Sequence, residues 1–260
     1  MRSSVISGRF IKVWQRNFTV YQKIWKINFI PPLLEPLFYL FAFGTGLGAL
    51  VGSIVYRGSA VSYIGYIAPA LIGINMMYNS FFETTYASFV RMYYQKTFDA
   101  MLATPLSIHE IITGEIVWGA TKSVFATAIM LVVISFFGII HYPAALLLLP
   151  LAFIGGMAFG SVGMFFTSVM PSIDSFNLPI FLFITPMFLF SGTFFPLENL
   201  PMWAQKVAFV FPLTHLVKMT RALSLGYVET GLLLDLVYLL IFSAIFFPLA
   251  LHRMRKRLIK

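Results

Sequence analysis

The chain contains no cysteine and few charged residues of either sign. Without cysteine it has no disulfides, no thiolate metal site and no cysteine nucleophile. Only 10% of its 260 residues are charged, whereas a soluble domain carries about 25%. No polar stretch is long enough to form a second, soluble domain. These shortages exclude an ordinary water-soluble globular protein.

The chain is instead rich in apolar and aromatic residues. Hydrophobic residues make up 59% of the chain, aromatic residues 17%, and the mean hydropathy is +0.87. A globule of this length cannot hide so much apolar surface, so part of it must face lipid. The sequence therefore predicts an all-α polytopic membrane protein with six transmembrane helices. The predicted spans are about 29–54, 62–90, 109–138, 144–170, 176–192 and 231–251.

Residues 3–28 predict an amphipathic helix with an aromatic face and a basic face. Such a helix is typical of the membrane interface, although a solvent-exposed helix docked on protein is the alternative. We expect three parts: a cytoplasmic interfacial helix (1–28), a six-span domain (29–251) and a basic cytoplasmic tail (252–260). The aromatic face holds Phe10, Trp14, Phe18, Tyr21 and Trp25, and the basic face holds Arg9, Lys12, Arg16, Lys23 and Lys26.

The distribution of basic residues predicts the orientation in the membrane. If both chain ends lie in the cytoplasm, 13 of the 18 basic residues are inside and four are outside. This bias follows the positive-inside rule and requires an even number of spans. The inner residues are Arg2, Arg9, Lys12, Arg16, Lys23, Lys26, Arg91, Lys96, Arg253, Arg255, Lys256, Arg257 and Lys260; the outer ones are Arg57, Lys206, Lys218 and Arg221.

The cytoplasmic loop 91–108 has a helical pattern of its own. Thr104 and Pro105 would end this short helix, and Ser107 with Glu110 has the spacing of a capping box that starts the third span. The helix is either a plain connection or a lever that a cytoplasmic partner holds.

The segment 193–230 is too long for a tight turn and too interrupted to span. Its prolines, Pro196, Pro201 and Pro212, divide it into two short helices, which we expect to be external and re-entrant. Broken backbone at membrane depth is tolerated only where it is buried in protein or lines a polar cavity. The segment is therefore a candidate outer gate, with an external lid as the alternative.

Motifs for catalysis and nucleotide binding are missing. The chain has no P-loop, no dinucleotide fingerprint and no H-E-x-x-H sequence, and its four histidines are scattered. No nucleophile and base pair up by spacing, and we expect no metal site. Basicity is explained by the membrane, so nucleic acid is not an expected partner.

Apart from Glu110 of the capping box, five residues with charged side chains fall within predicted spans. Each costs roughly 2.5–3.5 kcal/mol near the bilayer centre by insertion scales, so each needs an explanation. They either pair and fix helix packing, or contact a transported solute or a proton relay. These intramembrane charges are Glu35, Glu83, Glu115, Lys122 and Asp235.

Four stretches together resemble a known family: residues 82–123, 185–201, 211–226 and 35–48. The most specific one, 82–123, reads FETTYASFVRMYYQKTFDAMLATPLSIHEIITGEIVWGATKS. The chain resembles permease subunits of ATP-binding-cassette exporters of the type 2 membrane-domain class. It is most similar to lipo-oligosaccharide (nodulation-factor) exporter permeases, with drug-exporting permeases a more distant match.

The resemblance implies partners and site residues. A second permease copy and two nucleotide-binding ATPase subunits would complete the transporter, with ATP and Mg²⁺ bound by the ATPase and no cofactor by this chain. The loop after the second span would be the coupling helix, and spans one and five would line the pathway. The implied ATPase contacts are Arg91, Lys96, Thr97, Asp99, Met101, Leu102, Thr104 and Pro105; the pathway and gate residues are Phe38, Tyr39, Phe41, Phe183, Phe188, Phe195 and Pro196.

The resemblance predicts an ATP-driven exporter, without an ATPase site of its own, in the bacterial inner membrane among its lipids. Its substrate would be amphipathic, such as a lipo-oligosaccharide, a polysaccharide or a lipid. Efflux of a hydrophobic drug or antibiotic is the alternative within the class. A secondary transporter is an alternative from another class. A further one is a multi-pass membrane enzyme acting on lipid-linked substrates, for which segment 193–230 offers only Glu198, His215, Lys218 and Arg221 as catalytic candidates.

Overall fold

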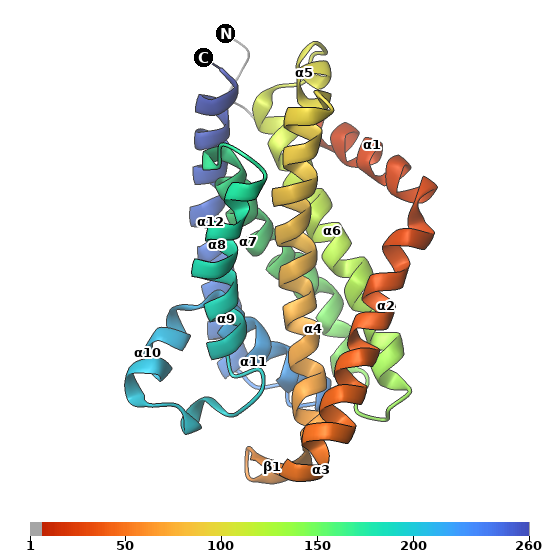
Figure 1. Ribbon diagram of the computed structural model, residues 1–260, viewed down its shortest axis with the longest axis vertical. Coiled ribbons are helices and arrows are strands. Elements are labelled where there is room, and N and C mark those ends of the chain that lie inside the picture. Colours follow the sequence, from red (N-terminus) through yellow and green to blue (C-terminus); the bar gives the residue numbers. More distant parts are fainter. Residues whose placement is uncertain (1–6, 260) are drawn as a thin grey trace.

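The computed structural model describes residues 7–259, which are mostly helical (Figure 1). The longer helices are α1 (Phe10–Lys23), α2 (Trp25–Phe41), α4 (Tyr63–Phe82), α6 (Ile108–Ser135), α7 (Leu148–Val169), α11 (Pro212–Ser224) and α12 (Gly231–Leu258). The shorter ones are α3 (Gly48–Val51), α5 (Thr97–Leu102), α8 (Asn177–Pro179), α9 (Thr185–Phe190) and α10 (Met202–Val210). π-Helical turns occupy Ala42–Leu47, Glu83–Ala87, Val90–Tyr94 and Ile180–Ile184, and 3₁₀ turns occupy Ala144–Leu147, Asp174–Phe176 and Leu197–Asn199.

Four helical segments among the described residues are long and apolar enough to cross a membrane: Trp25–Val51, Ile108–Ser135, Ala144–Val169 and Gly231–Leu258. They correspond to the first, third, fourth and sixth predicted spans. The second predicted span is helical as α4 and its π-helical continuation, and the fifth is the shorter apolar helix Asp174–Phe190. The count of six therefore stays a prediction, while a mostly helical fold with four candidate spans is established.

A β-hairpin departs from the all-helical prediction. Strands β1 (Ser53–Tyr56) and β2 (Ser59–Ser62) pair antiparallel, directly after the first span. Gly52 has φ +67° and α3 ends at Val51, so the predicted helix to residue 54 is three residues too long. Arg57 and Gly58, both at positive φ, form the two-residue turn between the strands.

Near both ends of the chain, the helix boundaries differ from the predicted ones. α1 ends at Lys23 and α2 begins at Trp25, so the aromatic Trp25 belongs to the first span helix; residues 3–6 of the predicted helix lie outside the described residues. At the other end α12 continues to Leu258. Basic side chains in its last turn suit the negative end of the helix dipole, which favours helix over a separate tail.

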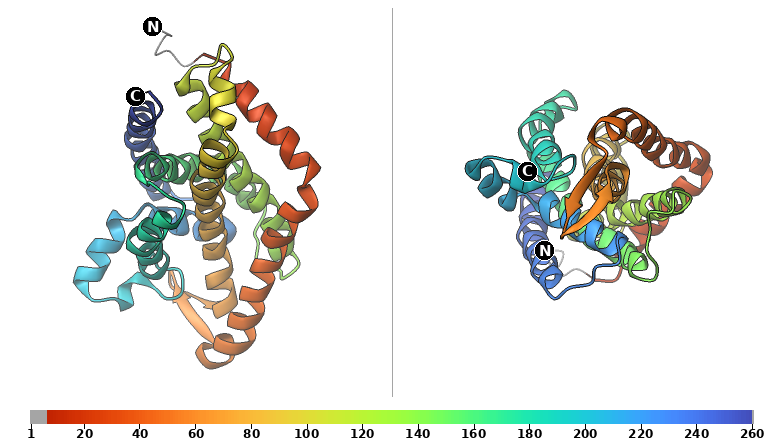
Figure 2. Two further views of the ribbon diagram at one scale, coloured as in Figure 1. Left: turned by 45° about the horizontal axis from the view of Figure 1, so that its top comes forward. Right: turned by 90° about the horizontal axis from the view of Figure 1, so that it is seen from below.

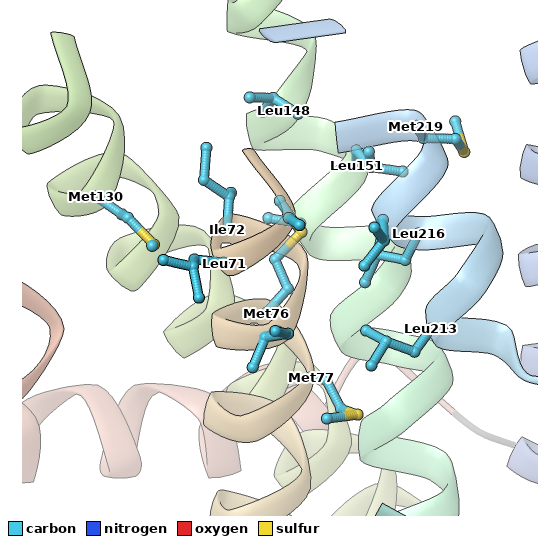
Figure 3. Close-up of a cluster of buried hydrophobic side chains, with 14 of the residues drawn as sticks. Leu71, Ile72, Met76, Met77, Met130, Leu148, Leu151, Leu213, Leu216 and Met219 are labelled. Carbon is cyan, nitrogen blue, oxygen red and sulfur yellow. The ribbon is translucent and has the colours of Figure 1, made fainter. Parts of the chain in front are cut away.

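The main core lies where α4, α6, α7 and α11 meet (Figure 3). Its labelled side chains are Leu71, Ile72, Met76 and Met77 of α4, Met130 of α6, Leu148 and Leu151 of α7, and Leu213, Leu216 and Met219 of α11. Glycines on α7 allow close approach: a Cβ on Gly156 would lie 2.6 Å from Ala120 Cα, and one on Gly163 would lie 2.9 Å from the Phe81 carbonyl oxygen. Gly156 therefore serves packing within one chain.

The chain places different segments at its two ends (Figures 1 and 2). α5, α1 and the C-terminal end of α12 lie at one end, at the top in Figure 1. The hairpin and α3 lie at the opposite end, and α10 projects from the side near it. The two segments that the sequence singles out, 91–108 and 193–230, are thus separated along the long axis of the molecule. We call these two regions the α5 end and the hairpin end.

Candidate functional site

The loop 91–108 contains the short helix that the sequence predicts. α5 follows Lys96, whose backbone is left-handed at φ +55°, and the Thr104 hydroxyl donates to the Met101 carbonyl (2.6 Å) as the helix ends. The capping box is also confirmed: Glu110 N–H donates to Ser107 Oγ (3.3 Å), and Ser107 N–H donates to Glu110 Oε2 (2.7 Å). α5 is therefore fixed between a tight turn and a defined start of α6.

α5 presents a polar side to the surface and an apolar side to the protein. Lys96 and Asp99 have side chains 66% and 61% exposed and lie 4.0 Å apart. Phe98 is fully buried in a second apolar cluster with Met92 and Ile111. Of the other predicted contacts, Thr104 and Pro105 are exposed, and Thr97, Met101 and Leu102 are half-buried. α5 therefore packs on the protein through Phe98 and leaves the side chains of Lys96 and Asp99 exposed.

Tyr93 and Tyr94 were not singled out from the sequence, yet they are 52% and 60% exposed beside α5. The Lys96 Nζ lies 5.4 Å from the centre of the Tyr93 ring. Exposed tyrosines next to a charged helix are typical of protein contact surfaces, where Tyr is enriched. The adjacent pair of tyrosines in the sequence was the available signal.

Arg91 lies away from this surface. Its guanidinium contacts Glu83 at 2.8 Å and Glu115 at 2.5 Å, and its side chain is 13% exposed. Glu115 also accepts hydrogen bonds from Asn17 of α1 (2.8 Å) and Ser88 (2.9 Å). The guanidinium of Arg91 is thus bound to two carboxylates inside the protein, and we leave Arg91 out of the proposed ATPase contact.

Three of the five predicted intramembrane charges join Arg91 in one buried network. Lys122 contacts Glu83 at 2.9 Å, and the Trp118 indole donates to the same carboxylate at 3.0 Å. Two carboxylates, Glu83 and Glu115, therefore face two cations, Arg91 and Lys122, so the charges balance. The network ties α1, the end of the second predicted span and α6 together.

Arg16 of α1 lies near this network. Burial is the main cause that lowers the pKa of its guanidinium, followed by repulsion from Arg91, while Glu115 raises it. The side chain donates to the neighbouring Asn17 amide oxygen at 2.8 Å. α1 is therefore electrostatically linked to the network through Asn17 and Arg16, which explains why a basic helix packs against buried charges.

At the hairpin end, two short helices, α10 and α11, occupy the predicted segment 193–230. α11 is mostly buried against α4, while α10 exposes Trp203 (65%) and Phe209 (55%). Pro201 and Pro212 stand at the starts of the two helices. The division of the segment by prolines is thus confirmed.

A cavity of about 1340 Å³ opens at the hairpin end. It is lined by the end of the first span, the hairpin, α9, α10, α11 and the start of α12. Of the predicted pathway and gate residues, Phe188, Phe195 and Pro196 line it. Phe43, Tyr56 and Tyr66 also line it and were missed; Tyr56 belongs to the hairpin, which was not predicted.

The remaining predicted pathway residues lie elsewhere. Phe38 and Phe41 are 66% and 58% exposed on α2, and Phe183 is half-buried against Phe166, with ring centres 6.1 Å apart. Tyr39 stacks on Phe43 at 5.9 Å. These residues do not converge on one surface within a single chain.

Glu35 lies beside Tyr39 in a small cavity that Asn75 of α4 also lines. Across residues 7–259 no ion pair involves Glu35, in contrast to the other four intramembrane charges. It is half-buried on a helix of which only a small share is buried. Among the five, Glu35 is the charge that packing explains least.

Asp235 and Arg221 in the cavity have close partners as well. Asp235 of α12 contacts His215 Nδ1 at 2.7 Å and Lys218 Nζ at 2.8 Å, both on α11. Arg221 is 5% exposed, donates to the carbonyl oxygens of Tyr66 (3.0 Å) and Gly192 (2.8 Å), and lies 3.7 Å from the centre of the Tyr66 ring. Arg221 thereby fastens the turn after α9 to α4.

Comparison with known proteins gives consistent matches along the chain. The profile of the ABC-2 type transporter family matches residues 9–225. Nodulation protein J of Rhizobium leguminosarum bv. viciae is 36% identical over 96% of this chain and 95% of its own length; that of bv. trifolii is 37% identical over 98% and 95%. The inner membrane transport permease YadH of Escherichia coli is 21% identical over 90% of each chain.

Proposed function

Because this chain belongs to the ABC-2 type transporter family, we propose that it is the permease subunit of an ATP-driven exporter of an amphipathic, lipo-oligosaccharide-like substrate. Members of the family are membrane transport subunits that work with a separate ATPase. ATP and Mg²⁺ would be bound by that ATPase. The full-length similarity to nodulation protein J supports the substrate class more than the distant similarity to YadH supports drug efflux.

The observation that carries this proposal is α5. An exposed polar helix, held on the protein by the buried Phe98, projects at the end of the molecule where α1 and the end of α12 also lie. Basic residues gather in the same region, which the positive-inside rule places in the cytoplasm. We therefore propose that Lys96, Thr97, Asp99, Met101, Leu102, Thr104 and Pro105, with Tyr93 and Tyr94, contact the ATPase.

The buried charge network supplies a physical route for coupling. The chain enters α5 from the helical segment that carries Arg91, and Arg91 binds Glu115 of α6, which binds Asn17 of α1. When nucleotide binding moves the ATPase surface against α5, a displacement would reach α6 and α1 through these short, charge-assisted contacts. The permease contributes a coupling surface and a path, and the ATPase contributes the bond chemistry.

The same proposal includes a topology for the chain in the bacterial inner membrane. Six crossings place both chain ends in the cytoplasm, with the second and fifth made by the helical segments around α4 and α9. The first span helix exposes apolar side chains such as Ile27 (72%), Phe38 (66%) and Leu50 (84%). In a membrane these would be covered by lipid or by a second permease copy, and Phe38 and Phe41 would then face the route between the copies.

A charge-swap experiment tests the coupling surface. The double variant Lys96→Glu with Asp99→Lys keeps an oppositely charged pair within α5 but reverses its polarity toward a partner. We expect co-purification of the cognate ATPase, and export of a labelled lipo-oligosaccharide by proteoliposomes, to fall roughly tenfold, since like charges would then face each other across the contact.

The matched control is Lys206→Glu, which reverses an exposed charge on α10 at the far end of the molecule. It should leave ATPase binding at the wild-type level. Both variants are first checked for normal folding by size-exclusion chromatography and thermal unfolding. If the swapped pair keeps full ATPase binding and export, α5 is not the coupling element.

A further inference from the structure

We infer that the cavity at the hairpin end is a binding site for a neutral oligosaccharide, the head group of an amphipathic substrate. The inference rests on the proposed export function and adds to it a location and a charge requirement. Its starting point is the volume of about 1340 Å³. That exceeds the roughly 300–1,000 Å³ of ordinary small-molecule pockets, so the cavity has room for several linked rings.

Part of the cavity lining is aromatic. Phe194 contacts two other rings of the lining: its ring centre lies 5.3 Å from that of Phe43 and 5.1 Å from that of Phe188. Phe195 and Phe209 add rings that are 37% and 55% exposed. Flat apolar rings of this kind pack against the C–H faces of sugar rings and also against acyl chains.

Another part of the cavity lining is polar. Glu198, Asn199 and Gln205 line it from the turn before α10 and from α10, while His215 and Lys218 line it from α11. These side chains offer both hydrogen-bond donors and acceptors, which is what a ligand rich in hydroxyl groups requires. A purely apolar drug would leave these polar side chains without partners, at a cost for every polar group it desolvates.

The charges of the cavity favour a neutral ligand over an anionic one. Lys218 is neutralised by Asp235 at 2.8 Å, and Arg57 is paired with Glu229. Arg221 is 5% exposed, and its described hydrogen bonds all go to backbone carbonyl oxygens. Every cation that lines the described cavity therefore has a partner already, so a phosphate, sulfate or carboxylate would have to break an existing contact.

The position of the cavity connects it with the proposed pathway. Phe43 belongs to the first predicted span and Phe188 to the fifth, the two spans that are expected to line the route. The cavity lies at the end opposite α5, which the proposed orientation places on the outer side. A head group held there would be the part of the substrate that leaves the membrane first.

The test measures binding of two tetrasaccharides to the full-length permease in nanodiscs by isothermal titration calorimetry. The neutral probe is tetra-N-acetylchitotetraose, and the anionic probe of equal length is tetragalacturonic acid. We expect the neutral probe to bind at least roughly tenfold more tightly, and Phe195→Ala or Phe209→Ala to weaken it about fivefold or more by removing stacking area.

The matched control is Trp203→Ala, which removes a 65%-exposed aromatic side chain from the same helix as Phe209 but outside the cavity lining. It should leave binding unchanged. The inference is overturned if the neutral probe does not bind, if the anionic probe binds as tightly, or if Trp203→Ala weakens binding as much as Phe209→Ala. ATPase co-purification is measured on the same samples. If only the oligosaccharide-site inference is wrong, the ATPase still co-purifies with the permease at the wild-type level.

Discussion

The two ends of the molecule use charged residues in opposite ways. Near α5, Glu83, Arg91, Glu115 and Lys122 are buried and bind one another in a closed network. At the hairpin end, charged side chains such as Lys218, 45% exposed, line an open cavity. The first arrangement binds helices together, and the second faces space that a ligand can fill.

This difference separates two roles that the sequence alone could not tell apart. An ionisable residue in a predicted span can fix packing or contact a transported solute. Glu83, Glu115 and Lys122 take the first role, since every one of them has a short contact to an opposite charge. Asp235 is paired too, but it lines the cavity with its partners. Three substitutions of decreasing effect test this contrast.

The largest effect is expected for Glu115→Gln. It removes one charge from a buried, balanced network and leaves a positive excess, which costs about 3–5 kcal/mol when one partner of a buried ion pair is lost. The free energy of unfolding is measured by denaturant titration in detergent, with Trp118 fluorescence as a local probe because that indole donates to Glu83.

The double variant Glu115→Gln with Arg91→Gln is the control for this prediction. It leaves Glu83 and Lys122 as a balanced pair at 2.9 Å, so most of the lost stability should return. If the double variant is as unstable as the sum of the two single ones, the charges do not act as one network.

A smaller effect is expected for Arg221→Lys at the hairpin end. The planar guanidinium reaches the carbonyls of Tyr66 and Gly192 together, and an ammonium group cannot reproduce that fork. Leaving one buried carbonyl unsatisfied costs about 1–3 kcal/mol. Arg57→Lys, which changes the half-exposed pair with Glu229 in the same way, should change the free energy of unfolding by less than about 0.5 kcal/mol. Equal losses in the two variants would contradict the clamp assigned to Arg221.

The helical architecture could be predicted from the sequence because apolar runs and prolines act locally. The four candidate spans, the prolines at the starts of α10 and α11, and the capping box of Ser107 and Glu110 all follow from residues near one another in the chain. The hairpin Ser53–Ser62 was missed because its strands are only four residues each and directly follow an apolar helix. Short strands beside a long apolar run give a weak alternating signal.

The site was harder to predict than the fold because its residues meet through tertiary packing. Glu83 and Glu115 were flagged separately by their cost in the membrane, but nothing in the spacing said that Arg91 would join them. The family resemblance implied that Arg91 lies at or near the ATPase contact. Burial of that guanidinium depends on a helix 24 residues away in sequence, which no local pattern reports.

The smallest effect on stability is expected for Lys96→Gln on α5. Its partner Asp99 is 4.0 Å away and both side chains are more than half exposed, so the pair contributes about 0.2–1 kcal/mol at most, and salt screens it further. Thermal unfolding should therefore match the wild type, whereas ATPase co-purification should fall, since the side chain faces outward to a partner. Asp99→Asn should behave alike. The contrast with Glu115→Gln is then complete: a buried charge would control folding, and an exposed one would control association. A loss of stability in Lys96→Gln comparable to that in Glu115→Gln would mean that α5 belongs to the packed interior and that the surface contact lies elsewhere.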